Sequence, residues 1–285
     1  MACAVAGMSR QNYYKQRSAR RREAIDEALV LELIRRERGR QPFLGARKLL
    51  RLLGPELRSA SVSIGRDRLF DLLRRHGLLI HRRRRSTRTT NSRHGLAVYT
   101  NAAKELMLNA PHQLLVSDIT YIRTEAGFVY LALVMDAFSR AIVGYDCSDS
   151  LEMEGALRAL EMALSQRPAG AETMHHSDRG CQYCCAAYVN RERRAGLAIS
   201  MTEENHCYEN SQAERLNGTL KREYGLDATF ETKSAAYEAV REGVLLYNHH
   251  RPHQALDYRV PMAVHCGSPD SPVSPPTSAP APAAA

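Results

Sequence analysis

Apolar residues recur at helical spacing in two segments near the N-terminus, residues 45–53 and 66–76. In the second segment Leu69, Leu72 and Leu73 fall on one face, which is typical of a helix that packs against a core. The residues between the two segments favour a turn: Gly54, Pro55 and the Ser-rich stretch 59–63. We therefore predict a helix, a connection and a second helix over residues 41–80.

The chemistry at the ends of the second helix makes this prediction more specific. Ser61 or Ser63 is suited to cap its start, and Gly77 is suited to end it. Before this pair, a helical pattern over residues 21–38 predicts an N-terminal helical segment within residues 1–40.

From residue 113 the pattern changes from helical to extended. Three β-prone segments come first: residues 114–122, 128–135 and 141–147. They are followed by a helix, a short strand, a helix, a strand and a helix: residues 152–164, 173–177, 183–193, 198–202 and from about 210 onward. This order predicts a layered α/β domain. The domain has no Gly-rich phosphate loop, so nucleoside triphosphate hydrolysis and a nicotinamide cofactor are not expected.

A chain of 285 residues predicts two folded units with a core that needs no disulfide staples. The most apolar stretch, residues 128–135, is far shorter than a membrane-spanning helix, and the N-terminus lacks the order of a secretory signal. We expect a cytoplasmic protein whose seven cysteines are reduced thiols. Residues 266–285 are mainly Ser, Pro and Ala, and we expect them to be disordered.

Basic and acidic residues are unevenly distributed along the chain. Residues 1–100 hold 24 Lys and Arg against 8 Asp and Glu, whereas the remainder holds 16 against 23. A basic front end favours a nucleic-acid partner, because Lys and Arg release counterions from phosphates. Composition alone does not distinguish that partner from a solvated basic face without a specific partner.

Arginines concentrate at two places in the basic front end. The predicted second helix presents four of them, as a helix-turn-helix recognition helix does: Arg66, Arg68, Arg74 and Arg75. A surface helix packed on its neighbour is the alternative. The predicted linker, residues 81–110, opens with a run that we expect to lie along DNA: Arg82, Arg83, Arg84 and Arg85.

Three acidic residues stand out in the second half. Asp118 lies in the middle of the first predicted strand, Asp178 directly follows the fourth, and Glu214 is on the last predicted helix. If they converge, they supply the oxygen ligands that hard divalent cations prefer for phosphodiester chemistry. The alternative is that each is a cap or a turn former.

The neighbours of these acids form motifs. Asp118 lies in VSDITYI (116–122), Asp178 in HHSDRGCQY (175–183) and Glu214 in NSQAERLNGTLKRE (210–223), with 35 residues between Asp178 and Glu214. Together with MSRQNYYK (8–15), MTEENHCYEN (201–210) and YNHHRPHQAL (247–256), they resemble the DDE transposases of bacterial insertion sequences. The similarity is to the second-frame catalytic protein of the insertion sequence three family, whose core is similar to retroviral integrase.

The resemblance implies an RNase H-like integrase catalytic core over residues 111–265, with a mixed five-stranded sheet and flanking helices. An all-α helix-turn-helix region would precede it. It also implies metal-binding catalytic roles for Asp118, Asp178 and Glu214, and a DNA contact for Lys221, two helical turns beyond Glu214.

The activity implied is metal-dependent cleavage and strand transfer of DNA, with Mg²⁺ as the metal and Mn²⁺ as a substitute. The partners implied are element ends, target DNA, further copies of the chain on DNA and an upstream-frame helix-turn-helix protein, with the protein at the nucleoid when bound. Two alternatives remain: a noncatalytic DNA-binding regulator derived from a transposase, and a sequence-independent nuclease of the RNase H-like class.

One departure from the motifs and three histidines within them invite other interpretations. Cys181, Cys184 and Cys185 form a CxxC pattern that, with Cys207 or His206, suggests zinc, although no second paired motif exists and buried thiols account for it better. Three histidines are candidates to orient phosphates or water, and equally for structural hydrogen bonds: His175, His176 and His253.

Overall fold

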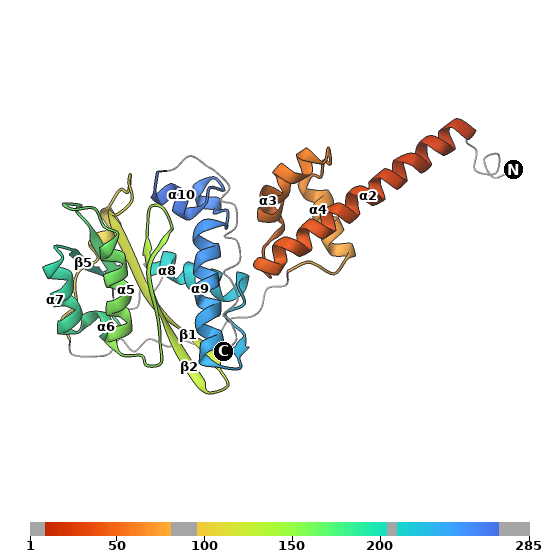
Figure 1. Cartoon of the computed structure of the whole chain (residues 1–285). Helices are drawn as coiled ribbons and strands as arrows, with labels where there is room; N and C mark the ends of the chain where they lie inside the picture. The colour runs from red at the N-terminus through yellow and green to blue at the C-terminus, as the bar shows by residue number, and fades with distance from the viewer. Residues whose placement is uncertain (1–8, 81–95, 204–209, 268–285) are drawn as a thin grey trace, which may run out of the picture. The chain divides into compact units, whose positions relative to one another are not determined.

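The computed structural model describes residues 9–80, 96–203 and 210–267, which form two compact units (Figure 1). The first unit ends at Arg83 and the second begins at Arg84. The tail after residue 267 and the linker arginines Arg82–Arg85 lie outside the described residues. Within the described ranges, no helix combines the length and the apolar character needed to cross a membrane.

The first unit is all-helical. It consists of α2 (Arg10–Arg40), α3 (Ala46–Ser59) and α4 (Arg66–Arg75). Its core draws on all three helices: Ile34 of α2, Leu49 and Leu53 of α3, and Leu72 of α4 are each at most 1% exposed. The sequence predicts separate segments over residues 1–40 and 41–80, and the described parts of both share this one core.

Two local predictions in this unit are wrong. The helix α3 does not stop before Gly54 and Pro55 but continues to Ser59. Its apolar stripe continues past the proline and buries Leu57, which offsets the local cost of proline within a helix. The N-cap of α4 is Gly65, not Ser61 or Ser63.

The other local predictions hold. Leu69, Leu72 and Leu73 are buried on one face of α4. Gly77 has a left-handed φ of 63° and follows the helix end, and the Leu78 amide donates to the carbonyl of Leu73. This is the glycine-terminated helix end that the sequence predicts.

The second unit is built on a mixed sheet. In chain order its strands are β1 (Leu114–Thr124), β2 (Gly127–Asp136), β3 (Ile142–Ser148), β4 (Met174–Ser177), β5 (Ala198–Met201) and β6 (Thr229–Phe230). The order across the sheet is β3-β2-β1-β4-β5. The first three strands are antiparallel, whereas β4 and β5 run parallel to β1. The predicted mixed five-stranded sheet is confirmed, and β6 adds a short sixth strand beside the far end of β1.

Helices cover both faces of the sheet (Figure 1). On one face lie α5 (Met153–Ser165), α6 (Cys181–Cys184) and α7 (Ala186–Arg194). On the other lie α8 (Ser211–Glu223) and α9 (Lys233–His249). Short elements complete the unit: η1 (Ala102–Glu105), η3 (Gln254–Leu256) and α10 (Pro261–His265). The sequence does not predict α9, β6 or α10, because it offers only the 247–256 motif in this region.

Candidate active site

The central strand β1 carries Asp118 at a point where the sheet is open along one edge. On that edge β1 pairs with β4 only as far as Val116, and with β6 only from Arg123. Between these two points, among the described strands, β1 has β2 alone as a ladder partner. The helix α8 contacts β1, so the carboxylate of Asp118 is half-buried between the sheet and this helix.

All three predicted carboxylates contribute to the electrostatics of this opening. Burial is the main cause that raises the pKa of Asp118 to about 7, and the nearby charges of Asp178 and Glu214 add to the effect. Asp178 directly follows β4, which neighbours β1, and the exposed Glu214 lies in the first turn of α8. The fold therefore brings Asp178 and Glu214 within electrostatic reach of Asp118, although they lie 60 and 96 residues further along the chain.

Polar neighbours fix two of these carboxylates. Asn217, one helical turn after Glu214, donates from Nδ2 to Oδ2 of Asp118 over 2.6 Å. The other oxygen of Asp118 accepts from the Ile119 amide at 2.9 Å, and Asp178 accepts from the Gly180 amide at 2.9 Å. Asn217 is a site residue that the sequence analysis missed, although its i+3 spacing from Glu214 puts it on the same helical face.

The ammonium of Lys221 lies at the same opening. Its Nζ is 4.4 Å from the centre of the Tyr121 ring, a cation–π distance. Burial lowers the pKa of Lys221, while Tyr121 and Asp118 act in the opposite direction. Lys221 therefore lies close to Asp118, as the resemblance of its motif implies.

A buried polar cluster supports β1 and β4 from within. Ser117, next to Asp118, has its Oγ 2.6 Å from Nε2 of His175, and Nδ1 of His175 lies 2.6 Å from Oε1 of Glu192. Each of these three side chains is 1% exposed. Of the two interpretations of His175, the structural one fits this burial, and the same holds for His176, which contacts the hydroxyl of Ser200 at 2.9 Å.

Residues 251–253, the RPH of the YNHHRPHQAL motif, follow α9 and have a structural role. The buried guanidinium of Arg251 donates to both carboxylate oxygens of Glu223, at 2.8 and 3.1 Å. Because Glu223 ends α8, this ion pair ties the helix of Glu214 and Asn217 to the end of α9. The carbonyl of His253 accepts from the amides of Leu256 and Tyr258 in the turn that follows.

A cleft of about 480 Å³ opens beside the carboxylates. Asp118 and Asp178 line one part of it, and the β1–β2 hairpin and the start of α6 line the rest. Within the ranges that the structure describes, no three His, Cys, Asp or Glu side chains already stand close enough to hold a metal ion.

The cysteines of the CxxC pattern behave as ordinary thiols. Cys184 is buried, with its Sγ 3.7 Å from the sulfur of Met201, and burial raises its pKa to about 11. Cys181 is exposed, and all five cysteines in the described ranges are free. Cys207 and His206, the other partners in the zinc interpretation, lie outside those ranges.

The predicted DNA-contacting arginines of α4 are surface residues with local partners. Arg66 pairs with Asp67 at 2.8 Å and Arg68 pairs with Glu23 of α2 at 2.6 Å. Arg75, further along α4, pairs with Glu27 of α2 at 2.7 Å. Much of the positive charge of this helix is therefore matched by acidic side chains.

Comparison with protein families gives two matches in the second unit. A model described as an integrase core domain matches residues 109–207, and a second model with the same description matches residues 195–261. The matched residues include Asp118, Asp178 and Glu214. Together with the strand order, the matches define this unit as an RNase H-like integrase core.

Relatives of nearly full length narrow the assignment. A 31 kDa protein of insertion element IS600 from Shigella sonnei is 37% identical over 92% of this chain and 96% of its own length. The transposase for insertion sequence element IS629 from Shigella sonnei is 35% identical, over 86% and 81%. The transposase InsF for insertion sequence IS3A from Escherichia coli K12 is 36% identical over 60% of each chain. The chain belongs to the IS3 family of bacterial insertion-sequence transposases.

Among solved structures, the magnesium-bound catalytic core of HTLV-2 integrase aligns at 15% identity and a TM-score of 0.44, over 55% of this chain and 97% of its own. An intasome of simian T-cell lymphotropic virus with a PP2A subunit aligns at 17% identity and a TM-score of 0.47, over 78% and 73%. Likenesses this weak add nothing to the family assignment. That assignment confirms the predicted DDE-type polynucleotidyl transferase and does not favour the noncatalytic regulator.

Proposed function

We propose that this transposase cuts and joins DNA at the opening beside β1, with Asp118, Asp178 and Glu214 as its catalytic carboxylates. The observation that carries the proposal is the convergence of the three acids on β1: Asp178 directly follows the neighbouring β4, and Glu214 lies in the first turn of α8, which contacts β1. In agreement with this, the charges of both acids add to burial in raising the pKa of Asp118. Carboxylates gathered around a partly buried acid are typical of a functional site rather than of a stabilising one. Caps or turn formers scattered over separate elements would not add to the pKa of Asp118 in this way.

The residues at the opening suit a divalent cation. Asp118, Asp178 and Glu214 would hold it, because their oxygens are hard ligands and a cation offsets both the burial and the like charges that raise the pKa of Asp118. We expect Mg²⁺ to fill this role and Mn²⁺ to substitute. When bound, the metal activates a water or a DNA 3′-hydroxyl and stabilises the leaving oxygen of the phosphodiester.

The chain's own residues prepare the carboxylates for this task. Asn217 and the Ile119 amide each hold one oxygen of Asp118, which fixes the plane of the carboxylate. The Gly180 amide orients Asp178 in the same way. Lys221, whose ammonium lies over Tyr121 and close to Asp118, would bind a phosphate of the DNA.

The test is cleavage and strand transfer on labelled duplexes that carry the element ends, with Mg²⁺ or Mn²⁺. We expect the wild type to produce strands joined to a target and Glu214→Gln to produce none while DNA binding persists. Glu238→Gln, on the exposed surface of α9, is the matched control and should keep activity. Strand transfer by Glu214→Gln would refute the assignment, and cutting without end dependence or joining would favour the nuclease.

The DNA contacts outside the opening are also part of the proposal. Arg66 and Arg68 would contact phosphates from α4, and Arg82, Arg83, Arg84 and Arg85 would follow the backbone. The partners proposed are both element ends, target DNA, further copies of this chain and an upstream-frame helix-turn-helix protein, with the complex at the nucleoid. Neutralising Arg82–Arg85 should weaken DNA affinity and its dependence on salt, and an unchanged salt slope would contradict that role.

A further inference from the structure

The cleft beside the carboxylates extends beyond what metal binding requires. From Asp118 and Asp178 it continues along the β1–β2 hairpin, where aromatic side chains line it: Tyr121, Phe128 and Tyr130. Its volume of about 480 Å³ is typical of a site for a small planar ligand. The carboxylates and the aromatic side chains therefore share one continuous space.

The hairpin register gathers these rings. Tyr121 lies directly opposite Tyr130, and Arg123 lies opposite Phe128. The rings of Tyr121 and Phe128 meet edge to face, with centroids 5.3 Å apart. Phe128 is nevertheless 46% exposed, so much of this ring remains available to a ligand. A buried Phe would serve the core, whereas this one presents its surface beside the opening.

Positive charge accompanies the rings. Lys221 lies 4.4 Å from the centre of the Tyr121 ring, and Arg123 lines the cleft with an exposed side chain. On the opposite wall, Tyr183 is buried and meets Tyr188 edge to face at 5.3 Å, which makes that wall rigid. Aromatic surface together with cations is the composition that binds a base and its phosphate.

We propose that this cleft receives one unstacked nucleobase of the DNA strand whose phosphate lies at Asp118 and Asp178. The base stacks on Phe128 and Tyr130, while Arg123 and Lys221 contact the adjoining phosphates. Stacking in the cleft compensates for the stacking lost within the duplex, as in enzymes that extrude a nucleotide before reaction. The inference rests on the proposed function, because it assumes that DNA is the substrate of this opening.

The base could come from an element end or from target DNA, and the experiment separates the two. Binding is measured by fluorescence anisotropy in the Glu214→Gln background, so that no turnover occurs. Each duplex carries a single abasic site, moved one position at a time past the scissile or the attacked phosphodiester. One series uses end duplexes and the other uses target duplexes.

We expect one position at which the abasic site raises Kd about ten-fold. Phe128→Ala should raise the Kd of the intact duplex by a similar factor and remove the effect of the abasic site, because both changes delete the same stacking contact. Phe128→Tyr keeps the ring and should bind within about two-fold of the parent. The series in which this coupling occurs identifies the source of the base.

Phe128→Leu serves as the control for folding, since it keeps an apolar side chain of similar size without an aromatic face. It should melt at the temperature of the parent yet show the weak binding of Phe128→Ala. If Phe128→Ala and the abasic sites raise Kd independently of each other at every position in both series, the proposal is overturned. Because the assay measures binding alone, that result is distinct from failure of the catalytic assignment, which appears as strand transfer by Glu214→Gln.

Discussion

At the scale of single residues, the first of the proposed catalytic carboxylates, Asp118, depends on neighbours that no simple motif identifies. Asp118 is half-buried and surrounded by two other acids, so its orientation relies on the amide of Asn217 and on the Ile119 amide. Asn217 is itself 8% exposed and contacts a residue 99 positions earlier in the chain. A hydrogen-bonding partner of this kind is expected to matter nearly as much as the ligand it orients.

Replacing Asn217 tests this dependence. We expect Asn217→Ala to lower the strand-transfer rate about ten- to hundred-fold and to raise the metal concentration needed for half-maximal activity. Asn190→Ala, at an exposed position on α7, is the control and should behave as the wild type. If Asn217→Ala leaves the metal concentration for half-maximal activity unchanged, the amide of Asn217 does not act through Asp118.

A second residue-scale prediction concerns stability and pH. Burial raises the pKa of Asp136, but the nearby His265, 3.9 Å away, and hydrogen bonds from Ser139 and the His112 amide outweigh it, and the pKa is lowered overall. Because the folded-state pKa lies below the ordinary value, the contribution of Asp136 is complete above that value and is lost as pH falls through the lowered one. We expect Asp136→Asn to reduce the free energy of unfolding at pH 7 by about 2 kcal/mol.

Urea unfolding between pH 7 and pH 3 measures this effect. The wild type should lose stability toward acid more steeply than Asp136→Asn, so the difference between the two narrows as pH falls. If the free energies of unfolding of the wild type and of Asp136→Asn differ by the same amount at every pH from 7 to 3, the ionised carboxylate of Asp136 is not what stabilises the fold.

At the scale of elements, the position of α8 determines where Glu214, Asn217 and Lys221 lie. Its inner face packs into the core through Ala213, Leu216 and Leu220, and its C-terminus is held by the Glu223–Arg251 ion pair. The YNHHRPHQAL motif thus acts on the active site through packing. Its Asn248 also exchanges two hydrogen bonds, both 2.8 Å, with the backbone of Ile142 on β3.

Removing Arg251 breaks its ion pair with Glu223 and leaves the partly buried carboxylate of Glu223 without its partner. We expect Arg251→Ala to lower the free energy of unfolding by about 3 kcal/mol. Arg241→Ala, whose exposed ion pair lies on the same α9, should change it by at most about 0.5 kcal/mol. Thermal unfolding of the two variants in parallel provides the measurement, and equal losses would contradict the structural role of Arg251.

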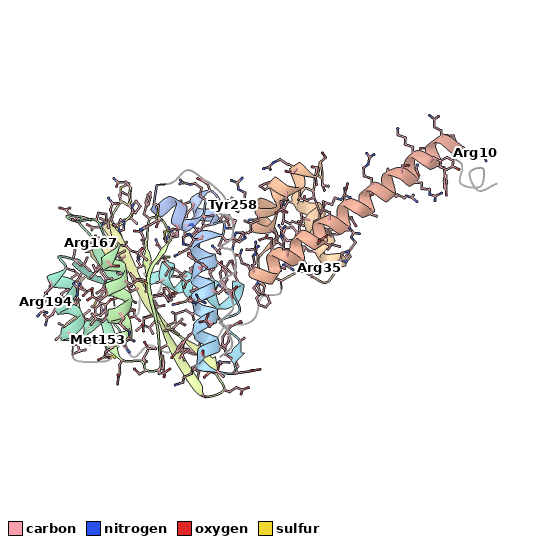
Figure 2. The ribbon with its side chains drawn as sticks, in the orientation of Figure 1. Arg10, Arg35, Met153, Arg167, Arg194 and Tyr258 are labelled. Atoms are coloured by element: carbon pink, nitrogen blue, oxygen red, sulfur yellow. The ribbon has the colours of Figure 1, made fainter. Side chains whose placement is uncertain are left out.

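The first turns of α2 differ from α4 in how their positive charges are paired. Residues 10–22 include six basic and no acidic residues. In Figure 2 Arg10 marks the end of this part of α2, which extends beyond α3 and α4. Arg10, Lys15 and Arg17 are exposed, and no ion pair joins them to a described residue. On α4, by contrast, Arg68 and Arg75 are already paired with acids of α2.

We therefore expect the triple replacement of Arg10, Lys15 and Arg17 by Ala to weaken duplex binding and to reduce the slope of log K against log salt by about 2 to 3. The paired replacement of Arg68 and Arg75 by Ala should change the slope less, because those charges are offset by Glu23 and Glu27. Anisotropy titrations at several salt concentrations compare the two variants. A larger slope change from the α4 pair would place the main phosphate contacts on α4.

At the scale of the whole molecule, charge and chemistry are divided between two units with separate cores. The helical unit holds the basic excess around one apolar cluster, and the integrase core holds the carboxylates on a sheet covered on both faces. The central strand β1 pairs with β2, β4 and β6, so Asp118 sits on the most heavily supported strand of the sheet. This support keeps the opening in place, while the edge of β1 between Val116 and Arg123 lacks a ladder partner among the described strands.

The sequence by itself determined the order of strands and of the longer helices from residue 114 to 223, because alternation and helical spacing are local properties of the chain. The one helix predicted over residues 183–193 is, however, divided into α6 and α7. It also determined the catalytic candidates, since Asp118, Asp178 and Glu214 stand in ordered motifs. The continuation of α3 through Pro55 was decided by the tertiary structure, because the burial of Leu57 depends on the surrounding helices. The same is true of Asn217, Arg251, Glu192 and the aromatic cleft. The partners of Asn217, Arg251 and Glu192 lie 17 to 99 residues away in the chain, and the cleft combines residues from 118 to 183, so all of them meet only after the sheet and its helices have packed.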